Sequence, residues 1–397
     1  MTDGNASKDM FARYGHEGRD GRRWSEGYMV DEGRVLRIFE NLASIYSPSY
    51  NERAIADHIT SYLTALSYLT FEDESGSSIN GNTGNIHVTI PGTAEGPCIL
   101  FAAHIDTVEP AQGVKVFVED GLIKSKSDTI LGADDKAGVT AMLELATVLA
   151  ATTFAHGPVH LVFTVAEEVG LKGAKYLDLD DKNLDYAYVL DANGKVGLIN
   201  VKAPYQDSFE VEFTGKAAHA GIAPETGINA IVAASKAISM MKLGRIDGET
   251  TANVGTIEGG IAGNIVAERA KIFAEARSIS IEKLQRQSKH MVECFNAAAE
   301  ETGASVNIVQ YRPYEGYSLT ADEPIVARAI SAMKSIGIEP VITHTGGGSD
   351  TNVFNAKGVV AVNLSMGAEN VHGKDEFLPM AELVKLSELL LALIKSP

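Results

Sequence analysis

The stretch VHLVFTVAEEVG, residues 159–170, decides the fold. Its first seven residues form a near-continuous apolar run, which is typical of a strand in a sheet that is covered on both faces. The run leads directly to Glu167 and Glu168, two like charges that repel each other and whose burial is costly. Either these glutamates lie on a solvated loop, or they belong to a site in which each carboxylate has its own role.

Sequence on both sides of this stretch alternates between short apolar runs and helical patterns, which predicts an α/β domain. The runs NIHVTI (85–90), CILFAAH (98–104) and YAYVLDA (186–192) are expected strands, and VKVFVEDGLIKS (114–125) is an expected hairpin around Asp120-Gly121. Expected helices are GRVLRIFENLASI (33–45), NERAIADHITSYLTAL (51–66) and DKAGVTAMLELATVLAA (135–151). Ser49 or Asn51 is the expected N-cap of the second of these helices.

The pattern changes between residues 206 and 312. Strand, helix, strand, strand, helix and strand follow one another there, which is the order of a ferredoxin-like α+β domain. Helix and strand alternate again from residue 313 to the end. We therefore predict one α/β domain, residues 29–205 and 313–397, with helices on both faces of its sheet, interrupted by an inserted α+β domain at 206–312. Residues 1–28, rich in Gly, Arg and Asp, are expected to form a flexible N-terminal extension.

Composition excludes several classes of function. The net charge is −18 and no basic run occurs, so nucleic acid and anionic membranes are not expected partners. Cys98 and Cys294 are the only cysteines, too few for a disulfide framework or a thiolate zinc site. The sequence contains no apolar run of membrane-spanning length and no hydrophobic signal region, so we expect a cytoplasmic protein.

Acidic and histidine side chains recur at the ends of the expected strands and at the start of one helix. They are His104 and Asp106 in LFAAHIDT, Asp134 and Asp135 in ILGADDKAG, Glu167 and Glu168, Asp191 in YVLDANG, and His372 in ENVHGKDEF. Each alone has an ordinary explanation, such as a helix cap, a turn or a solvated face. Together they favour a site beyond the carboxyl ends of the strands, where imidazole and carboxylate groups suit zinc, cobalt or manganese.

A pair of metal ions explains the adjacent glutamates. With two ions roughly 3.5–4 Å apart, one carboxylate can bridge both. One glutamate then binds metal while its neighbour accepts the proton of the activated water, and the cations remove the repulsion between the two carboxylates.

With these motifs the chain resembles the zinc-dependent exopeptidases, the family that includes peptidase T, carboxypeptidase G and the aminoacylases. The motifs HIDT, LGADDKAG, AEEVGLKGAK, HAGIAPETGINA, GGGSDTNVF and VHGKDEF occur in the family's order. The resemblance is strongest to the peptidase T branch and extends over essentially everything from residue 30 onward.

The resemblance implies a ligand set for two zinc ions, with cobalt or manganese as alternatives. His104, Asp134 and Asp191 would hold one ion, and Asp134, Glu168 and His372 the other, so that Asp134 bridges them.

The resemblance also implies catalytic roles. Glu167 would act as general base and then as general acid toward a metal-bridging water, and Asp106 would orient His104 and fix its tautomer. The Asp134–Asp135 peptide bond is expected to be cis, as in the family.

Substrate contacts carried over from the family are His219, Asn264 and Arg277. His219 would donate to the tetrahedral oxyanion, often from the partner subunit, although a buried core histidine is the alternative. Arg277 suits a bidentate carboxylate clamp, with a surface strand residue as the alternative. Peptidase T has an arginine at the position of Gly346, where it helps to read the tripeptide carboxylate.

The leading prediction is a di-zinc metallopeptidase that hydrolyses the N-terminal peptide bond of short peptides, with tripeptides as the foremost substrates. Because Gly346 replaces the arginine, an N-acyl amino acid deacylase with the same metal centre is an alternative. A non-catalytic peptide- or metal-binding protein is a third interpretation, which the presence of Glu167 disfavours. The resemblance further implies that the larger domain is a mixed-sheet catalytic domain, and that the inserted domain is a lid or dimerisation domain through which the protein forms a homodimer.

Overall fold

The computed structural model describes residues 30–179 and 183–395, so the predicted extension at 1–28 lies outside the described residues. These described residues form two compact units. The larger unit comprises the described residues up to Val201, Leu319–Thr343, and those from Ser349 onward; the inserted unit comprises Lys202–Ser318 and His344–Gly348.

The inserted unit is therefore wider than the expected range of 206–312. The expected last strand ended at Arg312, but the strand continues to Tyr314 because a register shift between Tyr311 and Tyr314 accommodates Pro313. A short strand, Tyr317–Ser318, then pairs with Lys202 and Ala203, which brings both flanks of the insertion into this unit.

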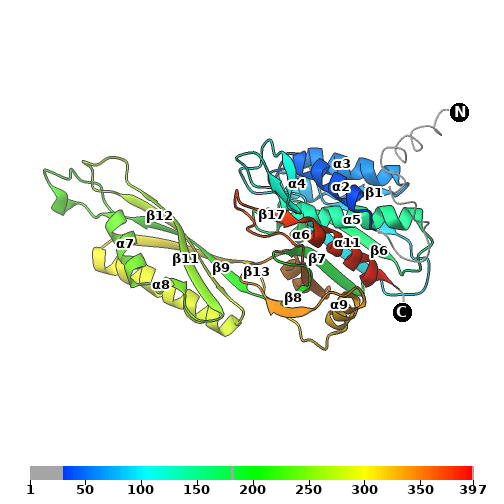
Figure 1. The fold of residues 1–397 in the computed structure, drawn as a ribbon. Coiled ribbons are helices and arrows are strands. Elements are labelled where there is room, and N and C mark those ends of the chain that lie inside the picture. Colours follow the sequence, from blue (N-terminus) through cyan, green and yellow to red (C-terminus); the bar gives the residue numbers. More distant parts are fainter. Residues whose placement is uncertain (1–29, 180–182, 396–397) are drawn as a thin grey trace. The chain divides into compact units, whose positions relative to one another are not determined.

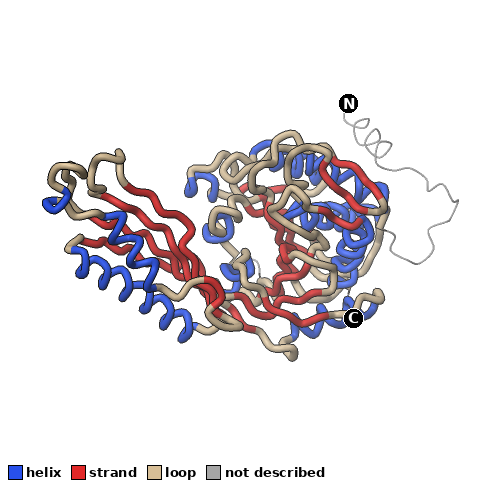
Figure 2. Tube along the Cα trace, turned by 60° about the vertical axis from the view of Figure 1, so that its left-hand side comes forward, coloured by secondary structure: helices blue, strands red, loops and turns tan. Residues whose placement is uncertain are grey.

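The larger unit is built on a mixed sheet (Figures 1 and 2). Along the sheet the strand order is β1 (Thr70–Glu72), β2 (Ile86–Ile90), β6 (Val159–Thr164), β3 (Ile99–His104), β7 (Tyr186–Ala192), β16 (Ala361–Ser365) and β8 (Leu198–Ala203), with β15 (Val341–His344) also paired to β8. The short strand β14 (Tyr317–Ser318), which belongs to the inserted unit, pairs with the end of β8. Strand β3 runs parallel to both β6 and β7, and β16 runs parallel to β7 but antiparallel to β8. Every residue of β3 and β6 is buried, so both faces of the sheet are covered, as predicted.

A smaller sheet carries the predicted hairpin. Its strand order is β17 (Phe377–Pro379), β5 (Leu122–Ser125) and β4 (Val116–Glu119). Asp120 and Gly121 connect β4 to β5 with positive φ angles of 50° and 76°, as a tight hairpin turn requires, which confirms the prediction.

The helices of the larger unit are α2 (Glu32–Ser44), α3 (Arg53–Ala65), α4 (Ser75–Ile79), α5 (Ala133–Ala151), α6 (Lys172–Tyr176), α9 (Pro324–Ser335), α10 (Asp350–Ala356) and α11 (Met380–Ile394). Helix α2 begins at its cap Asp31, which accepts the N–H of Arg34, and buries one apolar face. Helix α5 is buried nearly all round and packs against α2, α3 and α11. Arg34 and the buried Glu144 form a bidentate ion pair, both contacts 2.6 Å, that joins α2 to α5.

The predicted cap of α3 is wrong. The helix begins after Glu52, and neither Ser49 nor Asn51 caps it. Ser49 instead donates its hydroxyl to Asp106, and Glu52 is fully buried with its carboxylate turned toward other backbone amides.

Apart from one short additional strand, β10, the inserted unit has the predicted β-α-β-β-α-β order, and in Figure 1 its two long helices lie on one face of its sheet. Its elements are β9 (Tyr205–Thr214), the short helix η2 (Pro224–Thr226), α7 (Ala230–Met240), β10 (Gly244–Arg245), β11 (Thr250–Gly259), β12 (Arg269–Ser278), α8 (Ile281–Thr302) and β13 (Ser305–Tyr314). The sheet order is β10-β11-β12-β9-β13. Phe209, Phe213 and Phe295 fill the space between sheet and helices.

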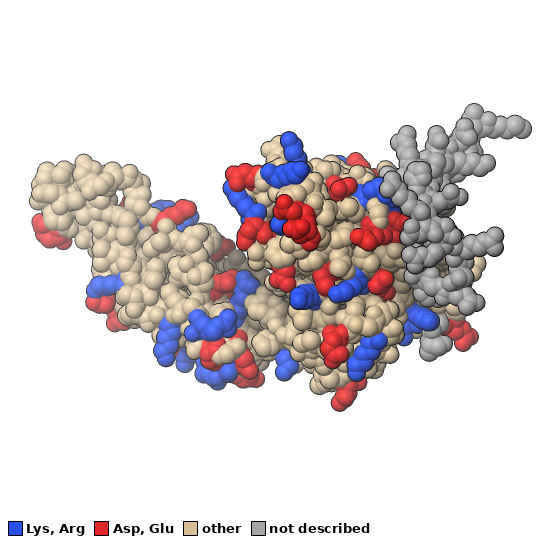
Figure 3. All heavy atoms as spheres, viewed as in Figure 1, with Lys and Arg blue, Asp and Glu red and all other residues tan. Residues whose placement is uncertain are grey.

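On the face drawn in Figure 3, acidic and basic side chains are interspersed. Among the described residues, none of the helices combines the length and apolar character that crossing a membrane requires.

Candidate metal centre

The larger sheet brings the candidate ligands to one edge. Strands β6, β3 and β7 are parallel neighbours, so their carboxyl ends lie side by side. His104 is the last residue of β3, Asp191 is the penultimate residue of β7, and Glu168 lies in the turn that follows β6. Asp134 comes from the first turn of α5, and His372 from the loop between β16 and β17. This is the crevice in which α/β sheets bind their ligands.

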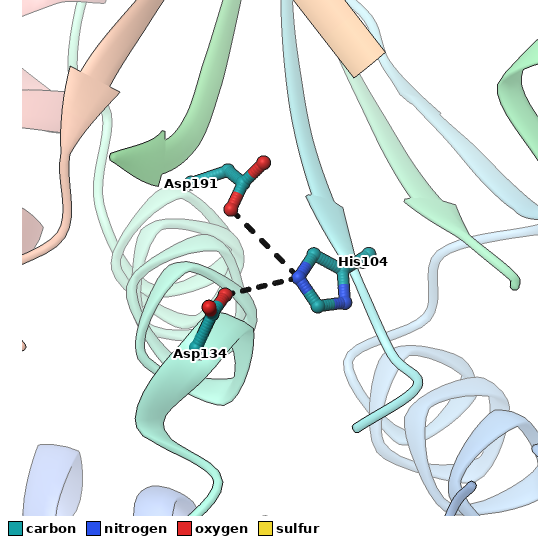
Figure 4. A group of neighbouring side chains, drawn as sticks. All are labelled: His104, Asp134 and Asp191. Atoms are coloured by element: carbon teal, nitrogen blue, oxygen red, sulfur yellow. Dashed lines mark hydrogen bonds and ion pairs between the residues drawn. The ribbon is translucent and has the colours of Figure 1, made fainter. Parts of the chain in front are cut away.

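Within the described residues, the five predicted ligands form two groups that share Asp134. In the first, His104 Nε2 lies 3.0 Å from Asp134 Oδ1 and 3.8 Å from Asp191 Oδ1, and the three side chains converge (Figure 4). In the second, His372 Nε2 lies 3.0 Å from Glu168 Oε1 and 3.3 Å from Asp134 Oδ2. Each oxygen of Asp134 thus faces a different histidine.

Asp106 holds both the histidine and the glutamate turn. His104 Nδ1 is 2.9 Å from the Asp106 carbonyl oxygen and 3.4 Å from its carboxylate. A carbonyl only accepts, so Nδ1 carries the proton and Nε2 is left to act as a ligand. The Asp106 carboxylate also accepts the N–H groups of Glu167 (3.0 Å) and Glu168 (3.2 Å) and the Ser49 hydroxyl (2.6 Å).

Sequence reasoning missed a second carboxylate on the same turn. The buried Glu52 accepts the N–H of Ala166 at 3.0 Å and that of Tyr50 at 2.9 Å. Ala166 has a φ of 49°, a conformation that is unfavourable for a non-glycine residue and is found at functional sites where the surroundings hold it. The only signal in the sequence was an acidic residue at the start of an apolar helix.

The turn before α5 contains the predicted cis bond. The peptide bond between Asp134 and Asp135 is cis, which confirms that prediction. The backbone N–H groups of this turn bond to Glu376, a residue of the VHGKDEF motif to which the sequence assigned no role.

The electrostatics of the centre reflect crowded carboxylates. Burial, reinforced by neighbouring carboxylates, raises the pKa of Asp191 and Glu167 well above the usual range. Burial would also raise the pKa of Asp134, but hydrogen bonds from His104 and His372 outweigh it and lower that pKa. Hydrogen bonds to Asp134 and Glu168 raise the pKa of His372 to about 10.

The residues present fit divalent metal ions. Each group offers one imidazole nitrogen and two carboxylate oxygens, all within 4.8 Å of one another, and this donor set suits zinc, cobalt or manganese.

The candidate substrate-binding residues all lie in the inserted unit. His219 and Asn264 are exposed and belong to neighbouring loops, where the Ala220 N–H donates to the Asn264 carbonyl at 3.0 Å. The alternative that His219 is a buried core histidine is therefore wrong. Arg277 lies on β12, half-buried, and forms a bidentate pair with Glu275 at 3.0 Å. Gly346 has open space around its Cα.

Buried carboxylates predict how the stability of the metal-free protein depends on pH. Burial raises the pKa of Glu52 and Glu376 to about 7, from an ordinary 4.5. Between these values the unfolded chain releases the protons while the folded chain keeps them. The free energy of unfolding therefore falls as pH rises from 4.5 to 7, by a few kcal/mol in total.

Thermal unfolding in a chelator at pH 5, 6 and 7 measures this slope. The Glu52→Gln variant, which cannot ionise at that position, should show a shallower decline. Burial lowers the pKa of Lys136 to about 7. Above pH 7 this residue therefore makes the free energy of unfolding rise with pH, so the predicted decline applies only up to pH 7. An unfolding temperature that rises from pH 5 to pH 7 contradicts the prediction.

Comparison with known proteins identifies the family. Residues 100–396 match the model of peptidase family M20/M25/M40. The chain is 42% identical to the Bacillus subtilis protein YqjE over 92% of its own length and 99% of that protein. Among solved structures, it resembles the aminopeptidase PepT of Bacillus cereus ATCC 10987 (42% identity, 92% of this chain and 98% of that chain, TM-score 0.83). It also resembles a tripeptidase of Staphylococcus aureus (39% identity, 93% of this chain and 99% of that chain, TM-score 0.87).

The chain therefore belongs to peptidase family M20/M25/M40. Within this family it is a peptidase T-like metallopeptidase, as its motifs predicted.

Proposed function

We propose that the protein is a di-zinc aminopeptidase that removes the N-terminal residue of short peptides, tripeptides foremost. The observation that carries the proposal is a buried acid, Glu167, beside two groups of candidate ligands that share Asp134. Glu167 is 8% exposed and interacts electrostatically with His104 and Asp191. Similarity to an aminopeptidase and to a tripeptidase supports the substrate class.

His104, Asp134 and Asp191 would hold one metal ion, and Asp134, Glu168 and His372 the other. Zinc is the proposed metal, and cobalt or manganese would suit the same donors. When bound, the ions would polarise the scissile carbonyl and lower the pKa of a water molecule.

Glu167 is the proposed proton carrier. Its carboxylate takes a proton from the attacking water and then delivers that proton to the leaving amine, so that it ends the cycle ionised. Asp106 and Glu52 hold the backbone of residues 166–168 and thereby orient Glu167 and its neighbour Glu168. A fixed acid–base group next to the reacting bond reduces the entropic part of the barrier.

His219, Asn264 and Arg277 are the proposed substrate-binding residues. His219 is exposed and can donate to an oxyanion, whereas Arg277 offers a guanidinium fork to a carboxylate. The inserted unit is the proposed homodimer contact, which sedimentation at micromolar concentration tests. A purely monomeric protein would exclude a His219 that acts on the partner's substrate.

Amine release from a substrate panel tests the proposed activity. The zinc-loaded protein is expected to cleave free tripeptides and to leave N-blocked tripeptides largely intact, because an aminopeptidase requires the free N-terminus. Dipeptides and N-acetyl amino acids complete the panel. Turnover of N-acetyl amino acids in place of tripeptides would favour the deacylase, an alternative kept because Gly346 lacks the arginine side chain that reads a tripeptide carboxylate in peptidase T.

A further inference from the structure

The carboxylate of Glu376 accepts the backbone N–H groups of four consecutive residues, Leu131–Asp134. Its Oε2 accepts the N–H groups of Leu131 and Gly132, both at 2.8 Å. Its Oε1 accepts those of Ala133 at 2.8 Å and Asp134 at 3.2 Å. The residue is almost completely buried, with 2% of its surface exposed. One carboxylate thus satisfies consecutive amides of the segment that ends on Asp134.

The same residue belongs to the loop that carries His372. That loop is closed at its base by reciprocal bonds between Glu369 and Phe377, of 2.9 and 3.1 Å. Inside it, Gly373 N–H donates to the Asn370 carbonyl at 3.1 Å, and the Asn370 amide donates to Asp375 at 2.8 Å. His372 itself has a φ of 66°. Because these hydrogen bonds hold the loop together, the position of Glu376 helps to fix the position of His372.

Glu376 therefore joins two segments that are far apart in the sequence, one carrying Asp134 and the other carrying His372. These two side chains are members of the same ligand group and lie 3.3 Å apart. Without the carboxylate, the amides of residues 131–134 would lose their acceptor, and the turn and the loop would be free to separate. Changing a group that fixes metal ligands in this way typically weakens metal affinity or activity by about 10–100-fold.

We propose that Glu376 is a positioning residue that locks the Asp134 turn to the His372 loop and so sets the geometry of the metal centre. This inference rests on the ligand roles proposed above. It predicts that a change at Glu376 weakens metal binding, with the largest effect on the ion held by Asp134, Glu168 and His372, because both the turn and the loop contribute to that group.

The test compares Glu376→Gln with the wild type and with Glu382→Gln. Glutamine keeps one oxygen for two of the amides but turns an NH₂ group toward the other two. Glu382 is a matched control, since it is also buried and accepts a backbone N–H, that of Val196 at 2.7 Å. Co²⁺ alone is the probe: its binding curve and visible absorption spectrum are recorded for each protein, together with hydrogen exchange of residues 131–134 in a chelator.

Glu376→Gln is expected to bind Co²⁺ at least about tenfold more weakly, with an altered spectrum and faster exchange at residues 131–134. Glu382→Gln should match the wild type in all three. A folded Glu376→Gln protein with wild-type affinity and spectrum would overturn the inference. If Glu376→Gln does not fold, Glu376→Asp takes its place, because its shorter carboxylate cannot span all the amides.

The outcomes separate this inference from the proposed function. A wild type that binds two Co²⁺ ions but releases no amine from peptides refutes the proposed activity, and the Glu376 comparison still stands on affinity and spectrum. A wild type that binds no Co²⁺ overturns both. In active protein, Glu376→Gln should lower kcat while KM changes little, since the carboxylate contacts backbone near the metal ligands.

Discussion

Glu167→Gln is expected to lower peptide turnover by about 10²–10⁴-fold, the usual contribution of general acid–base catalysis, while the protein still binds its metal ions. Glutamine has nearly the shape of glutamate but cannot take or deliver a proton. The backbone N–H of Glu167 would keep its bond to Asp106, so the turn that carries Glu168 should stay in place.

Steady-state kinetics and metal analysis on the same preparations check this expectation. Glu382→Gln serves as the control for loss of a buried carboxylate elsewhere in the larger unit. Equal turnover in the variant and the wild type would remove Glu167 from the mechanism. Absent turnover in both proteins, with metal bound, would give weight to a non-catalytic binding protein.

Asp134→Asn is expected to have an effect at least comparable to that of Glu167→Gln, because both groups of candidate ligands include this side chain. An amide offers one neutral oxygen where the carboxylate offers two charged ones, each facing a different histidine. If the ions contribute several kcal/mol to transition-state stabilisation, their loss lowers the rate by about 10³-fold or more, since each 1.36 kcal/mol is tenfold.

The comparison with Asp191→Asn makes this prediction specific. Asp191 belongs to one group only, so Asp191→Asn should keep the ion held by Asp134, Glu168 and His372. After dialysis, metal analysis should find about one ion per chain in Asp191→Asn and far less in Asp134→Asn. The same metal content in both variants would contradict the shared role of Asp134.

Sequence alone predicted that the candidate ligands cluster because most of them lie at or near the end of a strand or the start of a helix. His104 and Asp191 follow apolar runs long enough to identify as strands, and parallel neighbours place their ends together. The β-α-β-β-α-β order was equally readable, since its alternating strands and amphipathic helix differ clearly from the buried strands before them.

The supporting carboxylates could not be predicted for a physical reason. Glu52 and Glu376 accept hydrogen bonds from backbone amides. Every residue except proline has such an amide, so no particular residue type marks the partners in the sequence. Their partners lie far away along the chain, Ala166 for Glu52 and Leu131–Asp134 for Glu376. Ser49 was mispredicted for the same reason. Its position before a helical pattern favoured a helix cap, but its hydroxyl donates to Asp106, which is distant in the sequence.

The position of β16 in the sheet has a consequence for biosynthesis. This strand lies between β7 and β8, yet it is made roughly 160 residues after β8. At about 5–20 residues per second, the facing edges of β7 and β8 stay unpaired in a nascent chain for roughly 8–30 s until β16 is made. His372 is made later still. Ribosome-bound chains therefore pass through a stage in which the inserted unit is complete but the metal centre is not. If the ligand roles proposed above hold, the group of Asp134, Glu168 and His372 can take its ion only after His372 has been made, and the unpaired strand edges at this stage can pair with other chains.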